Sequence, residues 1–296
     1  MKSFQASGVI VPTITPFSRG GEQIDEGAVS AFNQWLVESG VDGVMPAGTT
    51  GEGLSLTLAE RRRLLELTVK AVDGQCAIMA HVGAITTAET IGLARHASEC
   101  GADAVSVVAP YYYPLPAEAL VAHFCRVAEA VPDTPVFLYN IPHCAGNRIT
   151  VAIVEAVIAR CPNIVGMKDS SGDLLAISQC IALRDGAFQV LNGSDPALLP
   201  ALRLGACGAV SGNANVVPEF VRDVTHAWAD GQAAAAEAAF AKMSAARELL
   251  AGNFWLIKHA LSLRGVLGGD VRPPQIPPDE PTIRRLEDEL PALLAE

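Results

Sequence analysis

Lys168 is the residue of this 296-residue chain whose type and position point most directly to chemistry. It follows residues 163–167, an apolar run that reads as a buried strand. A lysine at such a strand end reaches out to solvent, pairs with a carboxylate such as Asp169, or serves as a nucleophile. Because burial disfavours the ammonium form, the site would supply a neutral amine that attacks a carbonyl carbon. The other four lysines lie in terminal or helical segments: Lys2, Lys70, Lys242 and Lys258.

Tyr139 is a second candidate, near the end of the preceding apolar run at residues 136–140. A phenol beside the amine of Lys168 would pass protons to and from the carbinolamine that precedes a Schiff base. A tyrosine at a strand end is also often a core ring with a hydrogen-bonded hydroxyl. Both interpretations stay open from the residue alone.

The loop Gly48-Thr49-Thr50-Gly51-Glu52 offers two hydroxyl groups and a backbone that can approach a ligand closely at its glycines. Successive N–H groups in such a loop bind anions. The loop contains no lysine, so a small organic acid fits it better than a nucleotide. An ordinary turn between a strand and a helix is the alternative.

Residues 110–116 form a stiff aromatic loop with three consecutive tyrosines, Tyr111 to Tyr113, between prolines. Exposed rings at such a position are costly in a monomer. The loop therefore indicates an interface or a closed site.

Eight short apolar runs must position these residues, and they alternate with longer amphipathic stretches as in a parallel sheet covered by helices. The runs lie at residues 9–15, 43–47, 76–82, 104–109, 136–140, 164–168, 188–192 and 208–212. A glycine that ends a helix and leads into a strand recurs at Gly40, Gly101 and Gly205, which indicates one repeated β–α unit. Eight such units predict a closed (β/α)8 TIM barrel, with a doubly wound open sheet as the alternative.

Three further helical segments follow, at residues 232–251, 253–267 and 282–294, with a proline-rich connector at 273–281. They exceed what a barrel needs. We therefore expect a catalytic barrel over residues 1–231 and a C-terminal α-helical domain over residues 232–296.

The composition excludes several partners. The chain has 21 Lys and Arg against 32 Asp and Glu, a formal net charge of -11. An acidic surface repels phosphate backbones and anionic lipids, so we expect neither nucleic acid nor a membrane as a partner. The 7 cysteines, an odd number without a C-x-x-C pair, indicate a reducing compartment, and we expect the cytoplasm. The glycine-rich nucleotide motifs and paired metal-ligand spacings are also absent, so we expect no metal and no nucleotide cofactor.

Five segments taken together resemble the dihydrodipicolinate synthase / N-acetylneuraminate lyase family of Schiff-base-forming, pyruvate-dependent lyases. They are Gly48-Thr49-Thr50-Gly51-Glu52, Pro110-Tyr111-Tyr112, Tyr139-Asn140-Ile141-Pro142, Gly166-Met167-Lys168-Asp169 and Gly208-Ala209-Val210-Ser211. They occur in the family's order and spacing, and the extra C-terminal helices match as well.

The resemblance implies a role for each matching residue. Lys168 would form a Schiff base with a 2-oxo acid, and Tyr139 would be the proton-transfer group. Thr49 and Thr50 would hold the carboxylate of pyruvate, and Thr49 would also link Tyr139 to Tyr112 in a hydroxyl relay. The covalent imine would take the place of a cofactor.

The resemblance also implies a homotetramer built as a dimer of dimers, in which Tyr112 reaches into the site across the tight dimer interface. Val210 would supply a backbone carbonyl near the amine. The remaining candidate substrate contacts are Gly48, Asn192, Gly193, Ser194, Asp195, Ser211, Asn213, His143 and Cys144.

One departure bears on the second substrate. The synthases carry an arginine two residues after the proline of the Tyr-Asn-x-Pro motif, where it binds a carboxylate of the aldehyde; here Cys144 stands at that position, and Arg148 lies four residues further on. A thiol cannot form a bidentate pair with a carboxylate. The Tyr112-Tyr113-Pro114 sequence likewise resembles the sugar-acid aldolases and sialic acid lyases.

We therefore expect a class I aldolase or lyase that cleaves or forms a 2-keto-3-deoxy sugar acid from pyruvate and a hydroxyaldehyde. The first alternative is 4-hydroxy-tetrahydrodipicolinate synthase, which joins pyruvate to aspartate semialdehyde. The others are a 2-keto-3-deoxy acid dehydratase and a barrel that binds a 2-oxo acid without turnover.

Overall fold

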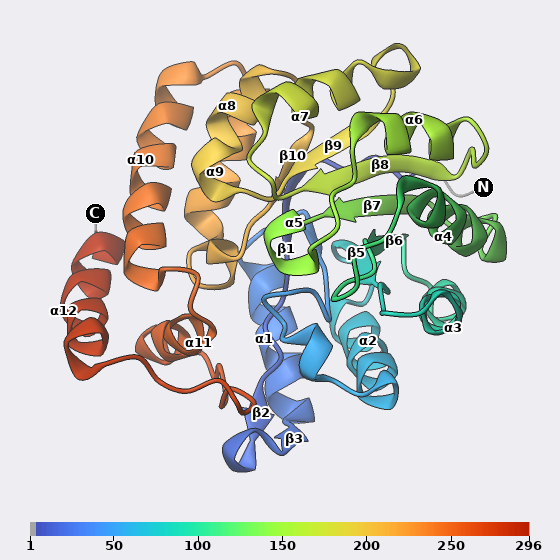
Figure 1. Ribbon diagram of the computed structural model, residues 1–296. Coiled ribbons are helices and arrows are strands. Elements are labelled where there is room, and N and C mark those ends of the chain that lie inside the picture. Colours follow the sequence, from blue (N-terminus) through green and yellow to red (C-terminus); the bar gives the residue numbers. More distant parts are fainter. Residues whose placement is uncertain (1–3, 296) are drawn as a thin grey trace. The chain divides into compact units, whose positions relative to one another are not determined.

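A computed structural model describes residues 4–295. The parallel strands are β1 (Gly8–Val11), β4 (Gly43–Val44), β5 (Ala77–His81), β6 (Ala104–Val108), β7 (Val136–Asn140), β8 (Ile164–Asp169), β9 (Gln189–Asn192) and β10 (Gly208–Val210). They form a closed barrel in the order β1, β10, β9, β8, β7, β6, β5, β4 (Figure 1). The predicted (β/α)8 barrel is confirmed, and the open doubly wound sheet is excluded.

Every predicted apolar run overlaps one barrel strand, although the bounds differ by a few residues. The run at residues 9–15 pairs only as far as Val11, because Pro12 has no N–H group to donate to the ladder. The chain then forms a short antiparallel hairpin, β2 (Phe17–Ser18) with β3 (Gln23–Ile24), which the sequence did not indicate.

The helices along the barrel are α1 (Glu26–Glu38), α2 (Leu58–Val72), α3 (Thr87–Glu99), α4 (Ala117–Ala130), α5 (Pro142–Ala145), α6 (Val151–Ile158), α7 (Leu174–Ile181), α8 (Leu198–Arg203) and α9 (Pro218–Ala229). Three of them end as the sequence predicts, at Gly40, Gly101 and Gly205, with φ of 73°, 91° and 103°. These left-handed conformations favour glycine and turn each helix directly into the next strand.

After α9 come α10 (Ala233–Leu250), α11 (Phe254–Leu263) and α12 (Glu280–Ala295), which confirm the three predicted C-terminal helices. Helix α10 packs against α9 and α12, and α12 also packs against α11. None of the helices within residues 4–295 combines the length and apolar composition needed to cross a bilayer.

The described chain forms two compact units. The first comprises the segment ending at Gly8 together with Ala77–Val210, and the second comprises Val9–Cys76 with the chain from Ser211 onward. A buried cluster of the second unit contains Phe17, Val29 and Leu64. The boundary predicted between residues 231 and 232 stays a prediction.

Candidate active site

Lys168 and Tyr139 lie side by side in the first unit. The two residues are paired in register between β8 and β7, so their side chains point to the same side of the sheet. Lys168 is 4% exposed and Tyr139 is 1% exposed. The Lys168 Nζ atom lies 4.1 Å from the centroid of the Tyr139 ring. The structure thus brings together the two residues that the sequence proposed for the chemistry.

Asp169, the carboxylate that the sequence offered as an ion-pair partner for Lys168, binds other groups. Successive side chains of a strand point to opposite faces. The Asp169 Oδ2 atom accepts a hydrogen bond of 2.7 Å from the Asn140 amide, and Oδ1 accepts bonds from the N–H and the hydroxyl of Ser171 at 2.8 and 2.5 Å. Asn140 also accepts a bond from the Ile149 N–H at 3.0 Å, so these groups fix the loops that follow β7 and β8.

Gly193 leaves space for the lysine side chain, and Gly166, two residues before the lysine, leaves space for the Phe137 ring. A Cβ atom at Gly193 would lie 2.8 Å from the Lys168 Cε atom and 2.2 Å from the Ser170 Oγ atom. A Cβ atom at Gly166 would lie 2.5 Å from a ring carbon of Phe137. Gly193 was predicted to contact substrate, and the structure gives it a packing role beside the lysine.

His81, at the end of β5, meets the Tyr139 ring edge to face, with 5.8 Å between the ring centroids and an interplanar angle of 85°. The histidine is buried. The sequence placed it at a strand end but gave no reason to choose it as a functional residue.

His143 and Cys144 lie in the short helix α5 after β7, and both side chains are exposed. Partial burial raises the pKa of the Cys144 thiol, and the positive charge of Lys168 opposes that rise. Arg148 is engaged elsewhere, because its Nη1 atom lies 3.3 Å from the Asp173 carboxylate.

The tyrosine loop places two rings at the surface of this chain. Tyr112 is 82% exposed and Tyr113 is also exposed, whereas Tyr111 is half-buried, contrary to the expectation that all three project outward. Tyr112 has a φ of 76°, an uncommon conformation for a residue with a side chain. Such a backbone conformation persists only where surrounding contacts stabilise it.

Asn147 supplies contacts that hold this loop. Its amide nitrogen donates to the carbonyl oxygens of Pro110 at 2.7 Å and Tyr113 at 2.8 Å, and its oxygen accepts from the Leu115 N–H at 2.9 Å. Asn147 was not among the residues predicted from the sequence, since one asparagine in a loop carries no spacing signal.

The remaining predicted site residues of the first unit are buried or half-buried. Asn192 is buried, and its amide donates to the Ser194 carbonyl oxygen at 2.8 Å. Ser194 and Asp195 are half-buried. Val210 is buried at the end of β10, and its predicted backbone contact near the amine stays a prediction.

The glycine–threonine loop belongs to the second unit. Thr49 and Thr50 are half-buried and Gly48 is buried. The loop is closed by two backbone hydrogen bonds, from the Glu52 N–H to the Thr49 oxygen and from the Gly53 N–H to the Gly48 oxygen, both 3.0 Å. Ser211 and Asn213, the remaining candidates, are buried in the same unit.

The fold and the lysine–tyrosine pair define a class of protein, a (β/α)8 barrel enzyme equipped for carbonyl chemistry on a lysine amine. Residues 5–293 match the Dihydrodipicolinate synthetase family, and the chain belongs to that family of pyruvate-dependent class I aldolases.

Known relatives cover almost the whole chain. A 4-hydroxy-tetrahydrodipicolinate synthase of Methanopyrus kandleri is 37% identical over 289 residues, which span 97% of this chain and 96% of the relative. The structure of the 4-hydroxy-tetrahydrodipicolinate synthase from Methylacidiphilum fumariolicum SolV matches with a TM-score of 0.93 at 31% identity, over 98% of this chain and 97% of that one. YagE from E. coli K12, a prophage protein of the same family solved in complex with pyruvate, matches with a TM-score of 0.91 at 31% identity, over 97% and 98% of the two chains.

Proposed function

We propose that this enzyme joins pyruvate to an aldehyde through an imine on Lys168. The observation that carries the proposal is the buried Lys168 amine over the Tyr139 ring, 4.1 Å from its centroid.

The reaction follows from these two side chains. The Lys168 amine attacks the C2 carbonyl of pyruvate, and the carbinolamine loses water to give the imine. Tyr139 transfers protons in these steps and in the loss of a C3 proton that gives the enamine. The enamine carbon attacks the aldehyde carbonyl, and hydrolysis of the product imine frees the lysine.

Thr49 and Thr50 bind the carboxylate of pyruvate in this proposal. The closed turn from Gly48 to Gly53 fixes both threonines, and a fixed row of hydroxyl and N–H donors suits an anion. The pyruvate complex of YagE, a relative of similar fold, supports pyruvate as the 2-oxo acid.

The proposed overall activity is that of a 4-hydroxy-tetrahydrodipicolinate synthase, with aspartate semialdehyde as the aldehyde. The synthase relatives at 37% and 31% identity support this assignment better than they support the sugar-acid aldolase expected from the sequence.

Aldol cleavage or synthesis of a 2-keto-3-deoxy sugar acid is the second candidate, and Cys144 favours it. The thiol stands where the synthases carry an arginine, and Arg148 is paired with Asp173 at 3.3 Å. A neutral polyol aldehyde does not require the bidentate guanidinium contact that a carboxylate does.

The proposed assembly is a homotetramer in which Tyr112 of one chain completes the site of another. The Tyr112 side chain is 82% exposed and its backbone is left-handed, and an exposed ring in a fixed conformation supports a contact with a second copy of the chain.

Two assays test the function. Enamine formation exchanges the methyl protons of pyruvate for deuterium in D2O, which proton NMR follows without any aldehyde. We expect exchange by the wild-type protein and none by Lys168→Met; a wild type without exchange would refute the imine.

The second assay compares turnover of pyruvate with aspartate semialdehyde against turnover of 2-keto-3-deoxy sugar acids. Activity on the sugar acids alone would refute the proposed synthase activity.

A further inference from the structure

Lys258 is a second buried lysine, and the proposed chemistry gives it no role. It lies on α11 in the C-terminal extension and is 3% exposed. Its Nζ atom donates three short hydrogen bonds, to the Glu52 Oε1 atom at 2.6 Å, the Thr15 carbonyl oxygen at 2.7 Å and the Asp270 carbonyl oxygen at 2.6 Å. An ammonium has three N–H donors, so each of them has a partner.

Glu52 is the last residue of the glycine–threonine loop, and its second carboxylate oxygen is also bound. The Oε2 atom accepts a hydrogen bond of 2.9 Å from the backbone N–H of Arg272. The backbone at Glu52 is left-handed, with φ of 52°. That conformation is costly for a residue with a side chain, so the bonds to the carboxylate hold the backbone in place.

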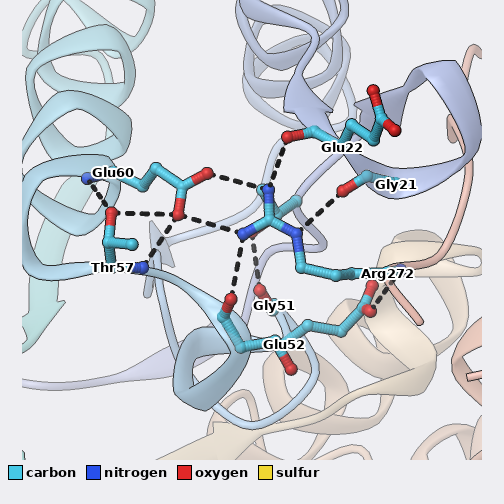
Figure 2. A network of polar contacts seen from close by, with 9 residues as sticks. Gly21, Glu22, Gly51, Glu52, Thr57, Glu60 and Arg272 are labelled. Atoms are coloured by element: carbon cyan, nitrogen blue, oxygen red, sulfur yellow. Dashed lines mark hydrogen bonds and ion pairs between the residues drawn. The ribbon is translucent and has the colours of Figure 1, made fainter. Parts of the chain in front are cut away.

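Arg272 ties the same region to the rest of the second unit. Figure 2 shows its guanidinium between the Glu60 carboxylate and the backbone of Gly21 and Glu22, with Glu52 beside the Arg272 main chain. The Arg272 hydrogen bonds lower the pKa of the Glu60 carboxyl group, which extends the charged form of this ion pair to lower pH.

The backbone of Glu52 is hydrogen-bonded to Thr49, one of the two proposed carboxylate-binding threonines. The Glu52 N–H donates to the Thr49 oxygen at 3.0 Å, and the Thr15 hydroxyl donates to the Gly51 oxygen at 2.6 Å. Gly212 lies close to Thr50, since a Cβ atom there would be 3.3 Å from the Thr50 Oγ1 atom. The loop is held at Gly51 by the Thr15 hydroxyl and at Glu52 through its carboxylate, and Lys258 binds both Glu52 and the Thr15 backbone.

We propose that Lys258 is a positioning residue that holds Thr49 and Thr50 in place for the pyruvate carboxylate, acting through Glu52. The inference rests on the proposed function, because it takes the two threonines as the carboxylate site. It assigns the C-terminal extension a part in substrate binding. Donors that are fixed in advance bind an anion without the cost of ordering a loop.

The test measures the rate of deuterium exchange into pyruvate against pyruvate concentration, in the full-length wild-type protein and three variants. Lys258→Met removes the ammonium at similar side-chain length. Glu52→Met with Lys258→Met replaces the whole pair by apolar groups, which generally preserves the fold when a single removal does not. Lys70→Met is the matched control, since Lys70 is an exposed lysine of α2 in the same unit.

We expect KM for pyruvate to rise on the order of tenfold in Lys258→Met and in the double variant, with a change in maximal rate of less than about threefold. Lys70→Met is expected to match the wild type. The double variant should regain the thermal stability that Lys258→Met loses, whereas its KM for pyruvate should stay above the wild-type value. The comparison separates an effect on the position of the threonines from an effect on stability.

If Lys258→Met folds and keeps the wild-type KM for pyruvate, the inference is overturned. If Lys258→Met does not fold, a wild-type KM in the double variant overturns it. A wild-type protein without any exchange would instead overturn the proposed function, so the two failures are distinguishable.

Discussion

Gly193→Ala adds a single methyl group beside the side chain of Lys168. The new methyl group would lie 2.8 Å from the Lys168 Cε atom and 2.2 Å from the Ser170 Oγ atom. Carbon atoms rest about 3.5 Å apart or more, so the end of the lysine must move by about 0.7 Å, the difference from 2.8 Å. Overpacking of this kind costs about 1–3 kcal/mol of unfolding free energy.

The displaced amine predicts a loss of activity beyond the loss of stability. A misplacement of about 1 Å lowers a rate by about 100-fold, so we expect deuterium exchange into pyruvate to fall between about 10-fold and 100-fold. The assay is the NMR exchange rate at saturating pyruvate, with thermal unfolding measured on the same samples. A folded Gly193→Ala protein with the wild-type exchange rate would refute the reasoning.

Two further variants locate the cause. Ser170→Ala combined with Gly193→Ala removes the Oγ atom and leaves the contact with Lys168, so stability should partly recover while exchange stays slow. Gly27→Ala in α1 is the control, because its added Cβ atom meets nothing closer than the Asp25 Oδ1 atom at 3.5 Å. Recovery of exchange in the double variant would place the effect at Ser170 instead.

Three other predictions follow from single side chains. Tyr139→Phe keeps the ring beneath the Lys168 amine and removes its proton-transfer group, so deuterium exchange should fall by about 100-fold or more; an unchanged rate would exclude the phenol. Asn147→Ala removes the three hydrogen bonds to the tyrosine loop and should cost about 2 kcal/mol of stability, with faster chymotrypsin cleavage at residues 111–113; equal cleavage would contradict this. Burial lowers the pKa of His123 from 6.5 to about 4, so the unfolded chain binds more protons between these values and stability is lost as the pH falls through them. Denaturant unfolding should show wild type losing about 3 kcal/mol more than His123→Asn between pH 7 and pH 4, and equal losses would contradict the shift.

The barrel was predictable from the sequence because its signals are local. Each apolar run and each glycine helix end, such as Gly101 with φ of 91°, is set by residues close in the chain. Lys168 and Tyr139 were predictable for the same reason, since each lies at the end of a buried run and parallel strands align their carboxyl ends.

Contacts between distant segments were not predictable. Lys258 lies in a helix like the other helical lysines, and only the fold brings it 2.6 Å from Glu52, 206 residues earlier in the sequence. Asn147 likewise gains its role by reaching back to Pro110. Composition and periodicity carry no information about such pairs, because they report which face of an element is buried and not what lies against it.

The central claim is that Lys168 forms the imine with pyruvate, and reductive trapping tests it most directly. The protein is incubated with pyruvate and sodium borohydride, which reduces an imine to a stable secondary amine, and the digested peptides are weighed by mass spectrometry. We predict that the peptide containing Lys168 gains the mass of one pyruvate less one water plus two hydrogens, while the peptide containing Lys258 is unchanged. An unmodified Lys168 peptide, or the added mass on Lys258, would contradict the account.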